Sequence, residues 1–388
     1  MSEDTKKLRI GITHGDFNGI SYEIIIKTLG EEGMLELFTP VIFGSSEVAA
    51  RAVARMNRQD FHFTVVKDMS EISDRQINFI DVCGEGVHQT LGMPSVEAGA
   101  AAVKALDAAC DALDAGEIDL LVTAPLNKHT AVEAGFAFPG HTEFLENRFA
   151  EDGAKATMIL FVDDLRVALV TGHIPLAEVS KQLTRERVTE AIENFNHALK
   201  SDFRCERPKI AVLSLNPHSG DDGTLGKEEK DVIIPAIEEC AAKGILAFGP
   251  YASDGFFGNG AYRNFDGVLA MYHDQGLTPF KTLASTRGVN FTAGLRIVRT
   301  SPDHGTAYDK AGHDVADPTS MREAIYAAID IYRNRTRYED SAANPLPIKE
   351  KSSRESKPRK SEPFPGFAKK ESDSSKDEKV EEQQEPQN

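Results

Sequence analysis

The chain has 388 residues, 40% of them hydrophobic and 27% charged, which is enough for one large or two medium-sized domains with a substantial core. Its formal net charge of −17 argues against a general nucleic-acid-binding protein, because such a surface repels phosphates. No stretch reaches the roughly 18 apolar residues of a membrane span, and MSEDTKKLRIGIT lacks the apolar core of a secretory signal, so we expect a cytoplasmic protein with no membrane or nucleic-acid partner.

Short β-branched or apolar runs alternate with longer segments of helical period, which is the pattern of βαβ units. The sequence therefore predicts an α/β fold with a largely parallel sheet. The expected strands span residues 8–13, 40–43, 61–66, 77–81, 119–123, 157–162, 167–171, 209–215, 267–271 and 288–292. The clearest expected helices span residues 95–115, 184–199, 227–243 and 318–335.

The composition changes abruptly after about Tyr338, where Lys, Glu, Ser, Pro and Gln become dominant. We expect residues 1–338 to be globular and residues 339–388 to form a disordered charged tail. That tail is either a solvated appendage or a segment for partner docking or solubility.

Four cysteines lie far apart in the sequence and form no C-x-x-C pair. Neither a disulfide framework nor a thiolate zinc site is indicated. We expect buried, reduced core residues at Cys83, Cys110, Cys205 and Cys240.

Three histidines each follow a strand-like run: VALVTGH ends at His173, KIAVLSLNPH at His218 and GVLAMYH at His273. Ligands in open α/β sheets collect at the carboxyl edge of the strands, so the three imidazoles can converge and bind a catalytic divalent metal ion. The alternative is three separate histidines bonded to backbone. Three polar neighbours are suited to orienting a ligand histidine, namely Asn216, Asp274 and Gln275.

Two further segments favour an anionic ligand. In GHTEFL the chain starts a helix, so His141 and Thr142 are candidate donors to a phosphate or carboxylate, the alternative being a simple helix cap. A later stretch places Lys281, Arg287, Asn290 and Arg299 among apolar residues, where cations are costly unless they meet an anion or form ordinary surface ion pairs.

Two glycine-containing loops complete the candidate site. The loop Asp303-His304-Gly305-Thr306-Ala307 can approach a cofactor closely, and the opening loop THGDFNG has Asp16 as a site-facing candidate. The dinucleotide pattern G-x-G-x-x-G is absent, so a nicotinamide cofactor would have to bind without the usual Rossmann turn.

These motifs together resemble the 4-hydroxythreonine-4-phosphate dehydrogenase family over nearly the whole globular part. The matching blocks are LVTAPLNK, GHTEF, VALVTGHIPL, LNPHSGDDGTLGKEE, AMYHDQGL, RGVNFTAGL and RTSPDHGTAYDKAG. The resemblance implies a homodimer of two-domain α/β/α subunits like isocitrate and isopropylmalate dehydrogenases, with the active site in the interdomain cleft at the dimer interface. The residues at which the chain divides into two domains do not follow from the sequence.

The same resemblance assigns roles to individual residues. It implies metal ligation by His173, His218 and His273 shared across the dimer, and substrate contacts from His141, Thr142, Lys281, Asn290 and Arg299. By a weaker match, the segment from His304 to Ala307 meets the adenosine part of the cofactor. Lys281 is also a candidate for proton transfer.

The implied reaction is metal-dependent, NAD- or NADP-linked oxidation of 4-phosphohydroxy-L-threonine at C3, followed by decarboxylation to 3-amino-2-oxopropyl phosphate, in pyridoxal phosphate biosynthesis. Zinc, magnesium, manganese and cobalt all remain candidates for the metal.

Other functions stay open at this point. The opening loop GDFNGISYE and the block TGH depart from the usual family pattern, which bears on substrate selectivity. The alternatives are a sister dehydrogenase for erythronate or threonate 4-phosphate, a phosphate acyltransferase, which does not need the histidines, and a non-catalytic binding protein.

Overall fold

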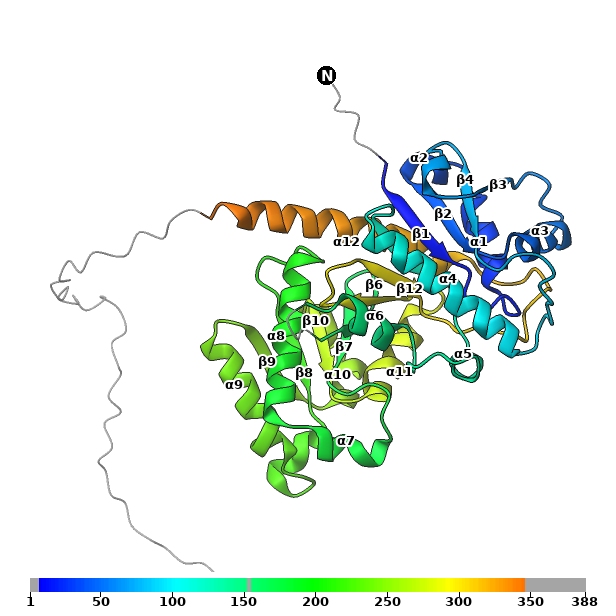
Figure 1. Ribbon diagram of the computed structural model, residues 1–388. Coiled ribbons are helices and arrows are strands. Elements are labelled where there is room, and N and C mark those ends of the chain that lie inside the picture. The colour runs from blue at the N-terminus through cyan, green and yellow to red at the C-terminus, as the bar shows by residue number, and fades with distance from the viewer. Residues whose placement is uncertain (1–6, 152–154, 346–388) are drawn as a thin grey trace, which may run out of the picture. The chain divides into compact units, whose positions relative to one another are not determined.

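The computed structural model describes residues 7–151 and 155–345, and its strands form one twelve-stranded mixed sheet (Figure 1). The strand order is β3-β4-β2-β1-β5-β12-β11-β6-β7-β10-β8-β9. The strands are β1 (Arg9–Thr13), β2 (Thr39–Gly44), β3 (Phe63–Val66), β4 (Ile77–Asp81), β5 (Leu120–Thr123), β6 (Thr157–Val162), β7 (Leu165–Leu169), β8 (Lys209–Leu213), β9 (Leu246–Tyr251), β10 (Gly267–Ala270), β11 (Val289–Ala293) and β12 (Arg299–Pro302).

The sheet is parallel in its two outer parts and antiparallel where they join. Strand β11 pairs antiparallel with both β12 and β6, and β6 pairs antiparallel with β7. The α/β prediction is confirmed, and the predicted parallel pairing of strands is correct outside this antiparallel join. The sequence did not predict β9 or β12, because β9 contains Gly249 and Pro250 and β12 is a four-residue run that begins with a charged residue.

Helices cover both faces of this sheet, so its central strands are buried runs without polar alternation; every residue of β2, β5, β10 and β12 is buried. The helices are α1 (Ser21–Leu29), α2 (Met34–Leu37), α3 (Ser46–Arg55), α4 (Val96–Asp114), α5 (Lys128–Glu133), α6 (His141–Phe149), α7 (Leu176–Gln182), α8 (Arg185–Ser201), α9 (Ile234–Ala242), α10 (Ser253–Gly258), α11 (His273–Ala284) and α12 (Thr319–Ala343), with short 3₁₀ or π segments η1 (Met69–Glu71), η2 (Pro217–Gly223), η3 (Glu229–Ile233) and η4 (Ala261–Asn264).

The long packing helices begin at the residues that local chemistry favours. The Ser95 hydroxyl accepts the N–H of Ala98 at the start of α4, and Thr184 accepts the N–H of Arg187 at the start of α8. Both helices bury one face, so the predicted ranges 95–115 and 184–199 agree closely with the structure.

Two predicted helix boundaries were wrong. The range 227–243 divides into the π-helical turn η3 and α9. Helix α12 continues to Ala343 (Figure 1), so the predicted globular boundary at 338 falls inside a helix. Charged side chains are good helix formers, and composition alone did not show where this helix ends. The predicted tail from 346 onward lies outside the described residues.

The cysteines are free thiols, but only two occupy the core. Cys110 and Cys240 are buried, whereas Cys83 and Cys205 are partly exposed. The expectation of four buried residues was therefore half right. Within residues 7–151 and 155–345, none of the helices combines the length and the apolar character that a membrane crossing requires.

The loop after β1 packs inside the protein instead of facing a ligand. The Asp16 carboxylate accepts the N–H of Asn18 at 2.9 Å and the hydroxyl of Tyr308 at 2.7 Å, and its side chain is fully buried. Burial raises the pKa of Asp16. The prediction that Asp16 faces the site was wrong, because the loop is clamped between 124–125 and 306–308.

Replacing Gly15 tests this packing. Gly15 has a φ of 62°, and a Cβ there would overlap the Pro125 carbonyl oxygen. Gly116 has a similar φ of 68° with open space around it. We expect Gly116→Ala to lower the free energy of unfolding by about 1 kcal/mol and Gly15→Ala by at least about 2 kcal/mol more. Urea unfolding measures both, and equal losses would contradict the packing argument.

His14 makes stability depend on pH. Its ring stacks on Phe17 and Tyr22, and burial lowers the pKa of His14 from 6.5 to about 4. The unfolded chain therefore binds the extra proton, and stability falls as pH drops from 6.5 towards 4, by about 3 kcal/mol at 1.36 kcal/mol per pKa unit. As pH drops over this range, the unfolding free energy of His14→Gln should fall less steeply than that of the wild type. Parallel curves for the two proteins would show that His14 does not cause the pH dependence.

Candidate functional site

Two of the predicted histidines meet at the carboxyl edge of the sheet. His173 follows β7 and His273 begins α11 after β10, and these strands are parallel neighbours. Their ring centroids lie 5.5 Å apart. The Asp274 carboxylate lies 2.7 Å from His273 Nδ1, which leaves Nε2 of that ring available as a ligand atom.

Charged side chains surround His173. Glu143 Oε1 lies 3.8 Å from His173 Nδ1, and this neighbour lowers the pKa of Glu143. Lys128 Nζ lies 3.5 Å from His173 Nε2. The two ring nitrogens of His173 therefore face groups of opposite charge, a carboxylate and an ammonium.

His218 does not join the pair within one chain. Strand β8 ends at Leu213, and the intervening residues lead into a left-handed turn that leaves His218 exposed. Among the residues that the structure describes, no three His, Cys, Asp or Glu side chains form a metal-binding group. The predicted convergence of three histidines is therefore not present in a single chain, because the turn after β8 separates His218 from the carboxyl ends of β7 and β10.

Next to the histidine pair lies a cavity of about 300 Å³. It brings together most of the residues predicted from the sequence. The predicted residues that line it are His141, Thr142, His173, His273, Lys281, Asn290, Arg299, His304 and Gly305.

Arg299 is the most deeply buried cation of this cavity. It is 3% exposed, and its guanidinium donates to the hydroxyls of Thr123 on β5 and Thr292 on β11. Burial lowers the pKa of Arg299 to about 10, so it remains charged at neutral pH. Its hydrogen bonds go to hydroxyls, and among the described residues it forms no salt bridge with a carboxylate. A buried cation of this kind favours an anionic ligand.

The other predicted ligand contacts differ in how they are held. Lys281 donates to the Asp303 carbonyl at 3.0 Å and pairs with its carboxylate at 3.2 Å, so its side chain is held in place. At the start of α6, burial and the nearby Arg299 lower the pKa of His141 well below its usual value, so its ring is neutral. Asn290 Oδ1 is buried with no hydrogen-bond partner in the part of the chain that the structure describes.

The predicted cofactor loop divides between two cavities. His304 and Gly305 line the main cavity, and Ala307 lines an adjoining one of about 210 Å³ that shares Lys281, Asp303 and His304 with it. The Thr306 carbonyl instead accepts the N–H of Ile20 at 3.0 Å. Thr306 thus serves packing through its backbone, because the opening loop lies against it.

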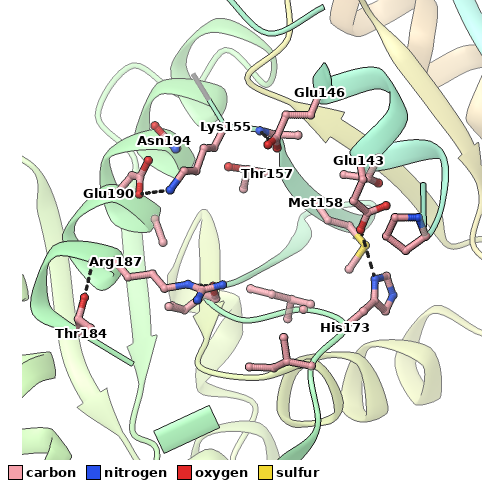
Figure 2. Close-up of a pocket in the computed structure, with 18 of the residues that line it drawn as sticks. Glu143, Glu146, Lys155, Thr157, Met158, His173, Thr184, Arg187, Glu190 and Asn194 are labelled. Carbon is pink, nitrogen blue, oxygen red and sulfur yellow. Dashed lines mark hydrogen bonds and ion pairs between the residues drawn. The ribbon is translucent and has the colours of Figure 1, made fainter. Parts of the chain in front are cut away.

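A larger charged cavity lies on the other side of His173. It has a volume of about 640 Å³ and shares Thr142, Glu143, Met158 and His173 with the first cavity. Figure 2 shows Lys155 directed to Glu190, at 3.4 Å, and Arg187 extending into the same space. His173 therefore separates two polar cavities.

Sequence reasoning gave no individual role to three charged residues of the main cavity. Lys128, Glu143 and Asp303 line it and contact assigned residues. A signal for Lys128 was available, because it begins the helix that follows the buried strand β5. Asp303 belongs to the glycine-containing loop expected to approach a cofactor, but its contact with Lys281, 22 positions away, did not follow from the sequence.

The chain is similar to proteins of one metabolic family. A family model described as Pyridoxal phosphate biosynthetic protein PdxA matches residues 36–328. A 4-hydroxythreonine-4-phosphate dehydrogenase of Bacteroides thetaiotaomicron is 51% identical over 343 residues, covering 88% of this chain and 94% of that protein. A protein of Oceanobacillus iheyensis with the provisional name D-threonate 4-phosphate dehydrogenase is 38% identical, covering 84% of this chain and 98% of its own.

Among solved structures, a 4-hydroxythreonine-4-phosphate dehydrogenase of Klebsiella pneumoniae has a TM-score of 0.71 at 34% identity, covering 85% of this chain and 99% of that one. Fold and sequence together define an enzyme of the oxidoreductase class. The chain belongs to the PdxA family of pyridoxal phosphate biosynthetic proteins.

Arg299 gives a test of the anion site that does not depend on the reaction. We expect inorganic phosphate at constant ionic strength to raise the unfolding temperature of the wild type and of Arg296→Met, whose arginine is exposed. Arg299→Met should be as stable as the wild type without phosphate, because it removes a buried charge, and should lose the phosphate-dependent rise. A full rise in Arg299→Met would place the anion elsewhere.

Proposed function

We propose that this chain oxidises 4-phosphohydroxy-L-threonine at C3 with NAD or NADP and a divalent metal ion, then decarboxylates the product to 3-amino-2-oxopropyl phosphate in pyridoxal phosphate biosynthesis. The observation that carries the proposal is the single cavity that joins the His173–His273 pair to Arg299 and Lys281. The names of the most similar relatives support the substrate.

The cavity suits a substrate with both phosphate and carboxylate groups. Arg299, Lys281 and Lys128 supply three cationic side chains, and Arg299 offers planar, two-pronged donors. Two polar atoms next to them, Asn290 Oδ1 and His304 Nε2, are buried without a partner among the described residues. A ligand that carries donors and acceptors would satisfy these atoms.

The two neighbouring imidazoles fit a divalent metal ion. His273 has one nitrogen fixed by Asp274 and the other available, and His173 lies beside it. The proposal takes His218 of the partner subunit as the third ligand, since His218 is exposed and lies outside the cavity of its own chain. The active form would then be a homodimer, which we place in the cytoplasm.

Bound there, a divalent ion would lower the pKa of the C3 hydroxyl and polarise the carbonyl that replaces it. The chain's own residues bind and orient the substrate. Arg299 and Lys281 hold its anionic groups, His141 is a neutral hydrogen-bonding partner, and Asp303 keeps Lys281 in place. Lys281 also remains the candidate for delivering a proton to the carbon that loses carbon dioxide.

The nicotinamide cofactor is proposed to lie along the cavity that adjoins the main one. His304 lines both cavities and Ala307 lines the smaller one, so the segment His304–Ala307 borders the passage between them. Burial lowers the pKa of His304, which therefore meets the cofactor as a neutral ring.

A second candidate is the sister reaction on D-threonate 4-phosphate. It is favoured by relatives of 36% and 38% identity that carry this provisional name. The two substrates differ in whether C2 bears an amino or a hydroxyl group, and the partnerless Asn290 Oδ1 accepts a hydrogen bond from either.

The decisive measurement is NADH formation, followed by absorbance, with each substrate and with or without added divalent metal. We expect metal-dependent turnover of 4-phosphohydroxy-L-threonine. Loss of a metal ligand in His218→Ala should lower kcat/KM roughly 1000-fold, which corresponds to about 4 kcal/mol of activation free energy. His62→Ala, at an exposed position, should leave kcat/KM unchanged. Equal or faster turnover of D-threonate 4-phosphate would transfer the assignment to the sister reaction.

A further inference from the structure

The turn that carries His218 has an exceptional backbone. Five successive residues from His218 to Asp222 have positive φ angles of 52°, 51°, 78°, 43° and 55°. Only Gly220 among them adopts this conformation without steric cost, and each other residue costs roughly 1–2 kcal/mol. Such strain persists only where the surrounding structure determines it, often at functional sites.

A buried carboxylate holds the segment just before this turn. Glu229 is 2% exposed, and its Oε1 accepts the N–H of Leu215 at 2.9 Å and of Asn216 at 2.8 Å. Its Oε2 accepts Asn216 Nδ2 at 3.0 Å. Three donors satisfy a charge that burial would otherwise make unfavourable. Glu229 also begins η3, and π-helical turns are frequent at functional sites.

The turn packs directly on this carboxylate and on the amide bound to it. A Cβ at Gly220 would lie 2.6 Å from Glu229 Oε2, and one at Gly226 would overlap Asn216 Nδ2. Because Gly220 and Gly226 have no side chains, the backbone of the turn lies directly against Glu229 and Asn216. The position of the turn therefore depends on these two residues.

The same network reaches the segment that carries His173. Asn216 Nδ2 also donates to Glu228 Oε2 at 2.8 Å, and Glu228 Oε1 accepts the Ser180 hydroxyl at 2.6 Å. Ser180 belongs to α7, which begins three residues after His173. Hydrogen bonds therefore connect the segment before His218 to the helix that follows His173.

We propose that Glu229 is a positioning residue, which acts with Asn216 to hold the left-handed turn so that His218 presents its imidazole outward in one orientation to a divalent metal ion. This proposal rests on the metal-dependent function proposed above. Ordering a loose loop on binding would cost about 1–2 kcal/mol per residue, so a turn held in advance strengthens metal binding.

The test measures cobalt affinity of the full-length protein by competition with a chromogenic chelator, together with the unfolding temperature of the metal-free form. In Glu229→Gln the new amide would face the Asn216 amide, donor against donor, and the charge is lost. We expect cobalt to bind roughly 10- to 100-fold more weakly. Asn216→Ala, which leaves Glu229 its two backbone donors, should show a smaller loss in the same direction.

Two reference variants make the result specific. Glu238→Gln is the same chemical change at an exposed position of α9 and should bind cobalt like the wild type. His218→Ala removes the ligand itself. With saturating cobalt, kcat of Glu229→Gln should recover to within a few-fold of the wild type, because its ligand is still present, whereas His218→Ala should stay inactive.

Each outcome decides between the two proposals. If Glu229→Gln only lowers the unfolding temperature and keeps wild-type cobalt affinity while His218→Ala loses it, Glu229 is merely structural and the positioning proposal is wrong. If His218→Ala also binds cobalt like the wild type, His218 is no ligand, and the metal site of the proposed function fails together with the positioning role.

Discussion

The buried guanidinium of Arg299 is the constraint on which the rest of the site depends. It lies at the first residue of β12, where the parallel strand β5 on one side meets the antiparallel strand β11 on the other. Its partners Thr123 and Thr292 come from these two neighbours and are uncharged. A cation in this position is stable only because hydroxyls solvate it, and it leaves the cavity with a positive potential that an anionic substrate can use.

The join between the two parts of the sheet also explains where the histidines lie. Strands β7 and β10 are parallel neighbours just beyond the antiparallel strands, so the residues after them emerge at one edge, beside the cavity that Arg299 lines. The geometry brings His173 and His273 together and directs His218 away. The homodimer proposed above would bring a third histidine to this pair.

Much of the fold could be predicted from local patterns. Ten of the strands and the long helices follow from apolar runs and capping residues, and Ser95 and Thr184 are examples in which one hydroxyl fixes a helix start. Strand β12 escaped prediction because its charged first residue is solvated by hydroxyls on the two neighbouring strands, Thr123 on β5 and Thr292 on β11, and strand pairing is not visible in a local pattern. The contact between Asp303 and Lys281 likewise joins residues 22 positions apart, so no local pattern shows it.

The opening loop is a case in which the sequence predicted a site residue that the structure uses for packing. Asp16 lies between the glycines of GDFNG, a composition typical of a ligand-binding turn. Its carboxylate nevertheless accepts a hydrogen bond from Tyr308, 292 positions away in the sequence. Composition reports what a side chain can bind. It does not report whether another part of the same chain has already bound it.

The sequence by itself determined the α/β class, most of the strands and the residue types that chemistry needs, because these depend on periodicity and on side chains within a few positions of each other. Only the tertiary structure decided which of those residues share a cavity, that Asp16 and Thr306 serve packing, and that His218 lies on a strained turn held by Glu229. These outcomes depend on strand order and on hydrogen bonds between distant segments, whose energies no local pattern contains.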